Sequence, residues 1–348
     1  LAIFCTFARY LNCKIENFSD YNKMKYIKSI IAIACGALLF HSGEVQAQSI
    51  TAEDINEQGR FENWIVREIH ESGIIGGNTK YVYNFNTGDT IRGNIPYESP
   101  EGNVFIPTNV MANVIGIIKT SNQVFPEKRG DGYCARLEVL EEHVKVIGMI
   151  NIKVVAQGSV ISGELYEPIR DTKSPYSKLD YGIPFTERPY GIKYDYKADV
   201  GHERIRSTAL SARKALGEPD FADIVVFLQK RWEDEDGNIY AKRVGTAYKR
   251  IKEDVEDWIN GEVLQIHYGD ISNTPYYEPY MALRGKGAEI ENFAKNSKGK
   301  SVTINEVGWA DADETPTHLI LWFSSSDGKA FYGGVGNKLW IDNVEIVY

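Results

Sequence analysis

The stretch GIPFTERPYGIKYDYKADVG, residues 182–201, is the part of the sequence that best indicates a fold. Pro184 and Pro189 each bias the preceding residue toward extended geometry, so the chain enters this segment stiffly. After Pro189 the residue types alternate with the two-residue period of a strand. One face carries Tyr190, Ile192, Tyr194 and Tyr196, and the other carries Gly191, Lys193, Asp195 and Lys197. The stretch therefore predicts a strand over 192–198 whose aromatic face packs on a core and whose other face is charged.

Strand-like segments of the same kind recur along the chain. Most of them alternate with period two and are bounded by Gly, Pro, Asn or Asp. They cover residues 80–85, 133–139, 150–156, 159–166, 222–229, 239–248, 263–269, 317–325 and 339–348. The Asp-Gly pair within EDEDGN, residues 233–238, predicts a hairpin between two of these strands. Helical periodicity is confined to 203–216 and, more weakly, to 286–298, and it does not alternate with the strands in a βαβ rhythm. We therefore expect an all-β antiparallel sandwich of jelly-roll type with a small helical insert at 203–216.

The composition limits the class of partner. The net charge is -9, and the chain contains 21 Tyr and 31 Gly. This acidity argues against nucleic acid or an anionic membrane surface as the partner. A neutral ligand or a cation fits better, and nothing in the composition indicates an oligomeric state.

The first 47 residues have the pattern of a leader that is not part of the fold. From Met24, a basic start at Lys25 and Lys28 is followed by an apolar run at 29–40 and by small residues that end at Ala47. This pattern predicts a signal peptide, preceded by an over-extended start, and an apolar run too short to span a membrane. We expect residues 48–348 to form one domain that is exported to the periplasm, the outer-membrane surface or the medium. Lipidation at Cys35 is the alternative.

One cysteine, Cys134, remains outside this leader. A disulfide framework is therefore not expected despite export, because a single cysteine has no internal partner. Its apolar surroundings, GYCARLEVL, predict a small core residue.

Several motifs occur in the order found in a known family. GIPFTERPYGIKYDYKA is similar to the family's Gly-x-Pro-Phe-x-x-Arg-Pro segment and the Tyr-x-Tyr-Lys that follows it. DFADIVVFL (220–228), VEDWINGEVLQIHYG (255–269), the closing LILWFSSSDGKAFYGGVGNKLWIDNVEIVY (319–348) and the opening RFENW (60–64) continue the likeness. The chain thus resembles the putative carbohydrate metabolism domain family over residues 60–348. The resemblance implies a jelly roll like that of galactose-binding modules, in exported proteins of gut bacteria that degrade polysaccharides. It implies carbohydrate binding or processing and transfers no catalytic residue.

The two ends of the domain suggest a structural calcium ion. In calcium-bearing carbohydrate-binding jelly rolls, a Glu after the first strand's Phe meets an Asp of the last strand at one ion. Glu62 and Asp342 have similar positions in this chain. Calcium takes several oxygen ligands, and an exported protein meets enough calcium to fill a weak site. The alternative is that these two side chains cap loops or pair with cations.

Loop aromatics are the candidates for sugar contact, because sugar rings stack on Trp and Tyr faces. These residues are Trp309, Tyr276, Tyr277, Tyr280 and Trp232, with ordinary loop packing as the alternative. Hydrolysis would need two carboxyl groups across a cleft. The acidic runs at 233–236 and 311–314 do not select a pair. Three functions stay open: a non-catalytic carbohydrate-binding protein, a glycoside hydrolase with an unidentified carboxylate pair, and a structural or adhesion module of the cell envelope.

Overall fold

The computed structural model describes residues 50–114, 116–146, 150–170, 175–208 and 213–348. Contacts group residues 48–348 into one compact unit. The predicted signal peptide, its cleavage after Ala47 and lipidation at Cys35 lie outside the described residues. No helix within these ranges is long and apolar enough to cross a membrane.

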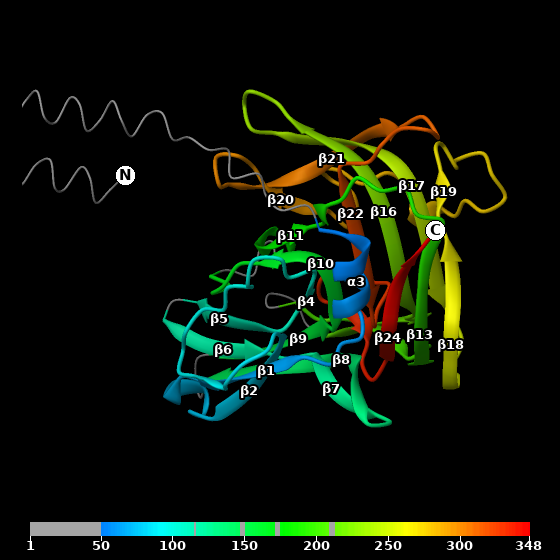
Figure 1. Cartoon of the computed structure of the whole chain (residues 1–348). Helices are drawn as coiled ribbons and strands as arrows, with labels where there is room; N and C mark the ends of the chain where they lie inside the picture. Colours follow the sequence, from blue (N-terminus) through cyan, green and yellow to red (C-terminus); the bar gives the residue numbers. More distant parts are fainter. Residues whose placement is uncertain (1–49, 115, 147–149, 171–174, 209–212) are drawn as a thin grey trace, which may run out of the picture. The chain divides into compact units, whose positions relative to one another are not determined.

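Two large sheets dominate the structure (Figure 1). The larger sheet has ten strands: β4 (Phe105–Pro107), β10 (Ser159–Leu165), β11 (Leu179–Tyr181), β12 (Ile183–Pro184), β16 (Ala222–Glu233), β17 (Ile239–Ile251), β19 (His267–Tyr268), β20 (Phe293–Lys295), β21 (Ser301–Trp309) and β22 (His318–Ser324). The second sheet has six strands: β7 (Val124–Arg129), β8 (Gly132–Val146), β9 (Ile150–Gln157), β13 (Gly191–Asp199), β18 (Val255–Gln265) and β24 (Lys338–Val347). The last strand, β24, lies between β13 and β8.

Short elements complete the fold. Smaller sheets contain β1 (Trp64–His70), β2 (Thr79–Phe85), β3 (Ile91–Arg92), β5 (Val110–Val114), β6 (Ile117–Ser121), β14 (Glu203–Arg206), β15 (Lys214–Pro219) and β23 (Tyr332–Gly334). The helical elements are α3 (Ala52–Gln58), η1 (Gly73–Ile75), η2 (Pro175–Lys178) and η3 (Pro279–Met281). Helix α3 begins with a capping box in which Thr51 and Asp54 satisfy each other's backbone N–H groups.

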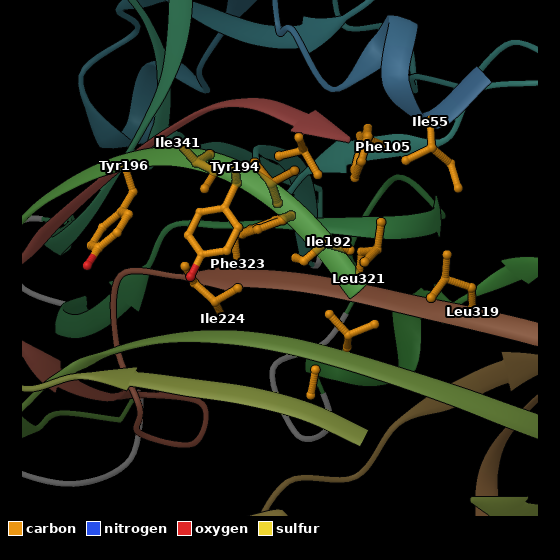
Figure 2. Packing of buried hydrophobic residues seen from close by; sticks show 14 of the residues in the cluster. Ile55, Phe105, Ile192, Tyr194, Tyr196, Ile224, Leu319, Leu321, Phe323 and Ile341 are labelled. Carbon is orange, nitrogen blue, oxygen red and sulfur yellow. The ribbon is translucent and has the colours of Figure 1, made fainter. Parts of the chain in front are cut away.

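The main core lies between the two large sheets, as a sandwich requires. From β13, Ile192, Tyr194 and Tyr196 point into this core. Figure 2 shows these side chains on the side of β13 that faces β22, the strand that carries Leu321 and Phe323 in the opposing sheet. The all-β sandwich predicted from 182–201 is thus confirmed, with Ile192, Tyr194 and Tyr196 inside. Tyr190, predicted on the same packed face, precedes β13 and is 49% exposed, so the prediction is wrong for this residue. Cys134, 1% exposed, is the predicted small core residue.

The larger sheet is buried on its outer face as well. Strand β16 is buried over its first eight residues, and its continuous apolar run IVVFL, residues 224–228, is typical of a strand covered on both faces. On the outer side, Phe227, Tyr248 and Trp322 form part of a second core. Ile271 and Met281, from the segment 271–292, pack over it, and Ile304 of β21 belongs to the same core. This covered outer face holds the candidate site described below.

The helical insert expected at 203–216 is wrong for the described residues of that segment. Residues 203–206 form β14 and residues 214–219 form β15, which pair antiparallel with each other. Strand β14 also pairs with β23, and Ile205 is buried with Val139 and Val155. Pairing with a distant strand thus overrides the local helical periodicity. In the second helical candidate, 286–298, the regular element is the short strand β20.

The tyrosine face of β13 yields a stability prediction. Tyr194 is fully buried, and its Oη has no hydrogen-bond partner among the described residues, whereas Tyr196 Oη accepts a hydrogen bond from Lys249 Nζ at 2.8 Å. An unpaired buried hydroxyl costs about 1–3 kcal/mol. We expect Tyr194→Phe to keep or raise the free energy of unfolding, and the matched Tyr196→Phe to lower it by about 1 kcal/mol. Urea denaturation of both variants tests this, and a clear loss of stability in Tyr194→Phe contradicts it.

Candidate functional site

The predicted loop aromatics divide into two groups. Tyr276, Tyr277, Tyr280 and Trp309 are half-buried and pack against the outer core of the larger sheet. Tyr248 joins two of them, because its backbone N–H donates to Tyr276 Oη at 2.7 Å and its ring lies 4.8 Å from that of Tyr280. Trp232 is 44% exposed and stacks instead on Tyr240, with ring centroids 5.9 Å apart. The structure therefore brings the 276–280 tyrosines together and leaves Trp232 apart from them.

Tyr280 lines a cavity of about 280 Å³ on this outer face. Tyr248 and Tyr332 supply further aromatic lining. The charged lining residues are Arg204, Glu218, Arg250, Arg284, Glu289, Asp327 and Lys329. Aromatic faces beside many hydrogen-bonding groups are the features expected of a site for a small polar ligand.

Arg250 anchors one wall of the cavity. It donates to both oxygens of Asp223 at 2.8 Å, and Tyr248 Oη donates to the same carboxylate at 2.5 Å. The Arg250 guanidinium also lies 4.1 Å from the ring centroid of Tyr280. This contact ties the sugar candidate Tyr280 to a fixed, fork-shaped ion pair.

Arg204 holds a second pair of carboxylates in the same wall. Its Nε donates to Asp220 at 3.0 Å, and its Nη2 is paired with Asp327, which also pairs with Arg250 at 2.9 Å. Asp220 is fully buried and accepts further hydrogen bonds from Gly334 N at 2.8 Å and from Ser326 Oγ at 3.0 Å. Three carboxylates and two guanidinium groups thus form one buried network behind the cavity.

The network shifts the pKa values of Asp220 and Asp327 in opposite directions. Burial, reinforced by Asp327, raises the pKa of Asp220 to about 7. Burial also opposes ionisation of Asp327, but Arg250 and Arg204 outweigh it and hold the pKa of Asp327 below its usual range. With three carboxyls beside two arginines, one proton on Asp220 balances the charges.

Arg284 is the other buried cation at this cavity, and it is 6% exposed. Its guanidinium lies 4.9 Å from the ring centroid of Phe227 and 5.0 Å from that of Trp322. One hydrogen bond is present, from Nη1 to Asn292 Oδ1 at 3.2 Å. Burial lowers the pKa of the Arg284 guanidinium. No acidic residue in the described ranges forms an ion pair with it.

Most of these residues could not be identified as site residues from the sequence. Asp220 and Asp223 lie in the motif DFADIVVFL, but there they resemble ordinary strand-flanking acids. Arg250 interrupts the apolar pattern near the end of β17, which is the available signal for a charged group on a covered face. Arg284 lies in a loop, where no periodicity marks a buried position.

Glu62 and Asp342 have separate partners in this structure. Glu62 Oε2 accepts a hydrogen bond from Tyr133 N at 3.0 Å. Asp342 pairs with Arg129 Nη1 at 2.6 Å, and Arg129 Nη2 pairs with Asp195 at 2.8 Å. No group of three or more His, Cys, Asp or Glu side chains able to hold a metal occurs in the described ranges. Cation pairing was the alternative for Asp342, whereas calcium at Glu62 and Asp342 stays an untested prediction.

A second cluster combines two acids and a tyrosine. Glu164 of β10 stands directly opposite Asp180 of β11 in the sheet. Tyr166 Oη lies 2.6 Å from Glu164 Oε2 and 3.0 Å from Asp180 Oδ2. Glu164 and Tyr166 line a cavity of about 360 Å³. Burial raises the pKa of Asp180. Since a hydroxyl carries one proton, the second short contact calls for a protonated carboxyl, and Asp180 is the better candidate.

The chain is similar to two solved structures. One is named as a putative glycoside hydrolase from Bacteroides thetaiotaomicron, with 17% identity, a TM-score of 0.43 and coverage of 81% of this chain and 70% of that one. Another bears the same description from Bacteroides vulgatus, with 16% identity, a TM-score of 0.41 and coverage of 83% and 96%. No family model and no curated protein matches the chain. The family resemblance therefore stays a prediction.

The pKa of Asp220 leads to a pH prediction. Its folded pKa of about 7 exceeds the ordinary 3.8, so the folded state holds a proton that the unfolded chain releases between these values. Stability contributed by Asp220 is therefore lost as the pH rises from about 4 to 7, with a slope of at most about 1.4 kcal/mol per pH unit.

Asp220→Asn keeps the size of the side chain and removes this titration. Urea unfolding at several pH values should show a flatter pH dependence in the variant than in the unchanged protein. Asp223 and Asp180 also have raised pKa values, but both are present in the two proteins, so the comparison removes their contribution to the slope. Equal slopes in the two proteins would show that Asp220 is already ionised at low pH.

Proposed function

We propose that the chain is an exported, non-catalytic carbohydrate-binding protein that holds sugar in the cavity beside Tyr280. The observation that carries this proposal is the combination of an aromatic face and anchored charged groups around a space of about 280 Å³. Sugars need both features, because their C–H faces stack on aromatic rings and their hydroxyls need hydrogen-bond partners. Export is supported by the leader pattern at 24–47.

Preorganisation supports binding at this position. Tyr248 and Arg250 are held by Asp223, and Arg204 is held by Asp220, Glu218 and Asp327. Side chains that are fixed before the ligand arrives lose little rotamer freedom on binding. The Tyr280 ring is also held before a ligand arrives, because the Arg250 guanidinium lies 4.1 Å from its centroid and the Tyr248 ring lies 4.8 Å from it.

A glycan array followed by calorimetry tests this proposal. Tyr280→Ala removes the stacking face, so we expect the dissociation constant of any bound glycan to rise about tenfold or more. Trp232→Ala is the matched control, because Trp232 is an exposed aromatic away from the cavity, and it should leave affinity unchanged. Absence of binding to every glycan contradicts the proposal, and loss of binding in Trp232→Ala with none in Tyr280→Ala places the site elsewhere.

Glycoside hydrolysis is the second candidate, and the pair Glu164 and Asp180 favours it. Two acids directly opposite each other destabilise a sheet, so their presence calls for a reason. Their contacts with Tyr166, at 2.6 and 3.0 Å, allow a separation compatible with the about 5–5.5 Å of retaining glycosidases. Asp180 would protonate the leaving oxygen while Glu164 attacks the anomeric carbon to form a glycosyl ester. Water activated by Asp180 would then hydrolyse that ester.

Release of reducing sugar from a panel of polysaccharides distinguishes the two candidates. The binding proposal predicts no release above that of a buffer control. Hydrolysis predicts release that falls at least about a thousandfold in Glu164→Gln, because the nucleophile is lost. Release that persists in Glu164→Gln and in Asp180→Asn excludes this pair as the catalytic one.

A further inference from the structure

Arg284 carries a charge that its surroundings do not balance. It is 6% exposed, lines the cavity of about 280 Å³ and makes one side-chain hydrogen bond, to a neutral amide. Its Nε and Nη2 have no hydrogen-bond partner among the described residues. A buried, unpaired cation is costly, and a built site with such a cation calls for an anion.

Glu306, which contacts the backbone of Arg284, does not supply this anion. Its side chain is buried, and its carboxylate pairs with Arg243 through Nε at 2.5 Å and through Nη2. Its Oε2 also accepts the backbone N–H of Arg284 at 2.7 Å, and the guanidinium of Arg284 forms no ion pair with it. Glu306 thus balances the charge of Arg243, and the positive charge of Arg284 is left over.

The remaining charges of the cavity wall largely compensate one another. Glu218 pairs with Arg204 at 2.9 Å, Asp327 pairs with Arg204 and Arg250, and Lys329 lies 3.7 Å from Glu289. Among the charged lining residues, Arg284 is thus the one without a charged partner in the described ranges. A neutral sugar would leave this charge uncompensated, whereas an anionic group on the sugar would balance it.

We infer that the cavity binds an acidic sugar, whose anionic substituent is held by Arg284 while its ring packs on Tyr280. This inference rests on the proposed carbohydrate-binding function and names its ligand class. The planar guanidinium presents Nε and Nη2 as a fork that fits the two oxygens of a carboxylate, and it also fits a sulfate ester. The contacts of the Arg284 guanidinium with the rings of Phe227 and Trp322 hold it against the sheet before binding.

Calorimetry with one ligand in charged and neutral forms tests the inference without any mutation. Trigalacturonic acid carries the carboxylates, its methyl ester has the same ring shape without the charge, and galactose 6-sulfate tests the sulfate alternative. A charge-assisted hydrogen bond in a buried site should make the acid bind about ten- to a hundredfold more tightly than its methyl ester. Preference for galactose 6-sulfate over galactose, without preference for the uronate, assigns the anion as sulfate.

Arg284→Gln then links the preference to this residue. The variant should lose the preference for the acid and keep the affinity for the methyl ester. Lys193→Gln is the matched control, because it removes one positive charge from β13, where Lys193 pairs with Glu345. This variant should keep the preference. Thermal melting checks that Arg284→Gln is folded, and if it is not, the comparison of acid and ester in the unchanged protein decides alone.

The two proposals fail in different ways. Equal affinity for acid and ester, together with equal affinity for galactose 6-sulfate and galactose, overturns the inference about Arg284 and leaves carbohydrate binding in place. A preference that persists in a folded Arg284→Gln also overturns it. Failure to bind any sugar of the array, charged or neutral, overturns the proposed function itself.

Discussion

Burial of the larger sheet on both faces is the constraint on which the rest of the structure depends. Its inner face packs on the sheet that contains β13 and β24. Its outer face carries Phe227, Tyr248 and Trp322, which would form a large exposed apolar patch if nothing covered them. Residues 271–292, which precede β20 and contain η3, pack over this outer face. A loop segment cannot fill the space as evenly as a second sheet, and the cavity beside Tyr280 is lined by residues of this segment.

The charged groups at this cavity follow from the same burial. Arg204 and Arg250 are tolerable there because Asp220, Asp223 and Asp327 surround them. Such a network is costly to build, and hydrophobic residues of the same volume would often stabilise a fold as well. Its presence beside an aromatic cavity supports the proposed binding function. Arg284, which has no charged partner among the described residues, supports the same proposal.

The sequence predicted the architecture better than the site. The alternation in 192–198 and the mostly apolar residues of 222–229 identify two strands. A strand buried on one face alternates between apolar and polar residues, whereas a strand buried on both faces is apolar along most of its length. The periodicity of 203–216 wrongly predicts a helix, because the pairing of β14 with β23 is a contact between residues far apart in the chain. Among the sugar candidates, Tyr280 lies at the cavity and Trp232 does not. The sequence carries no signal for Arg284, because the burial of a loop residue depends on tertiary packing alone.

A crystal structure with trigalacturonic acid bound would test the central claim most directly. The account predicts density for a sugar ring against Tyr280, with a carboxylate oxygen within hydrogen-bond distance of Arg284. Density for the sugar at Trp232, at the Glu164–Asp180 cavity or on the second sheet, with the Tyr280 cavity holding only solvent, would contradict it.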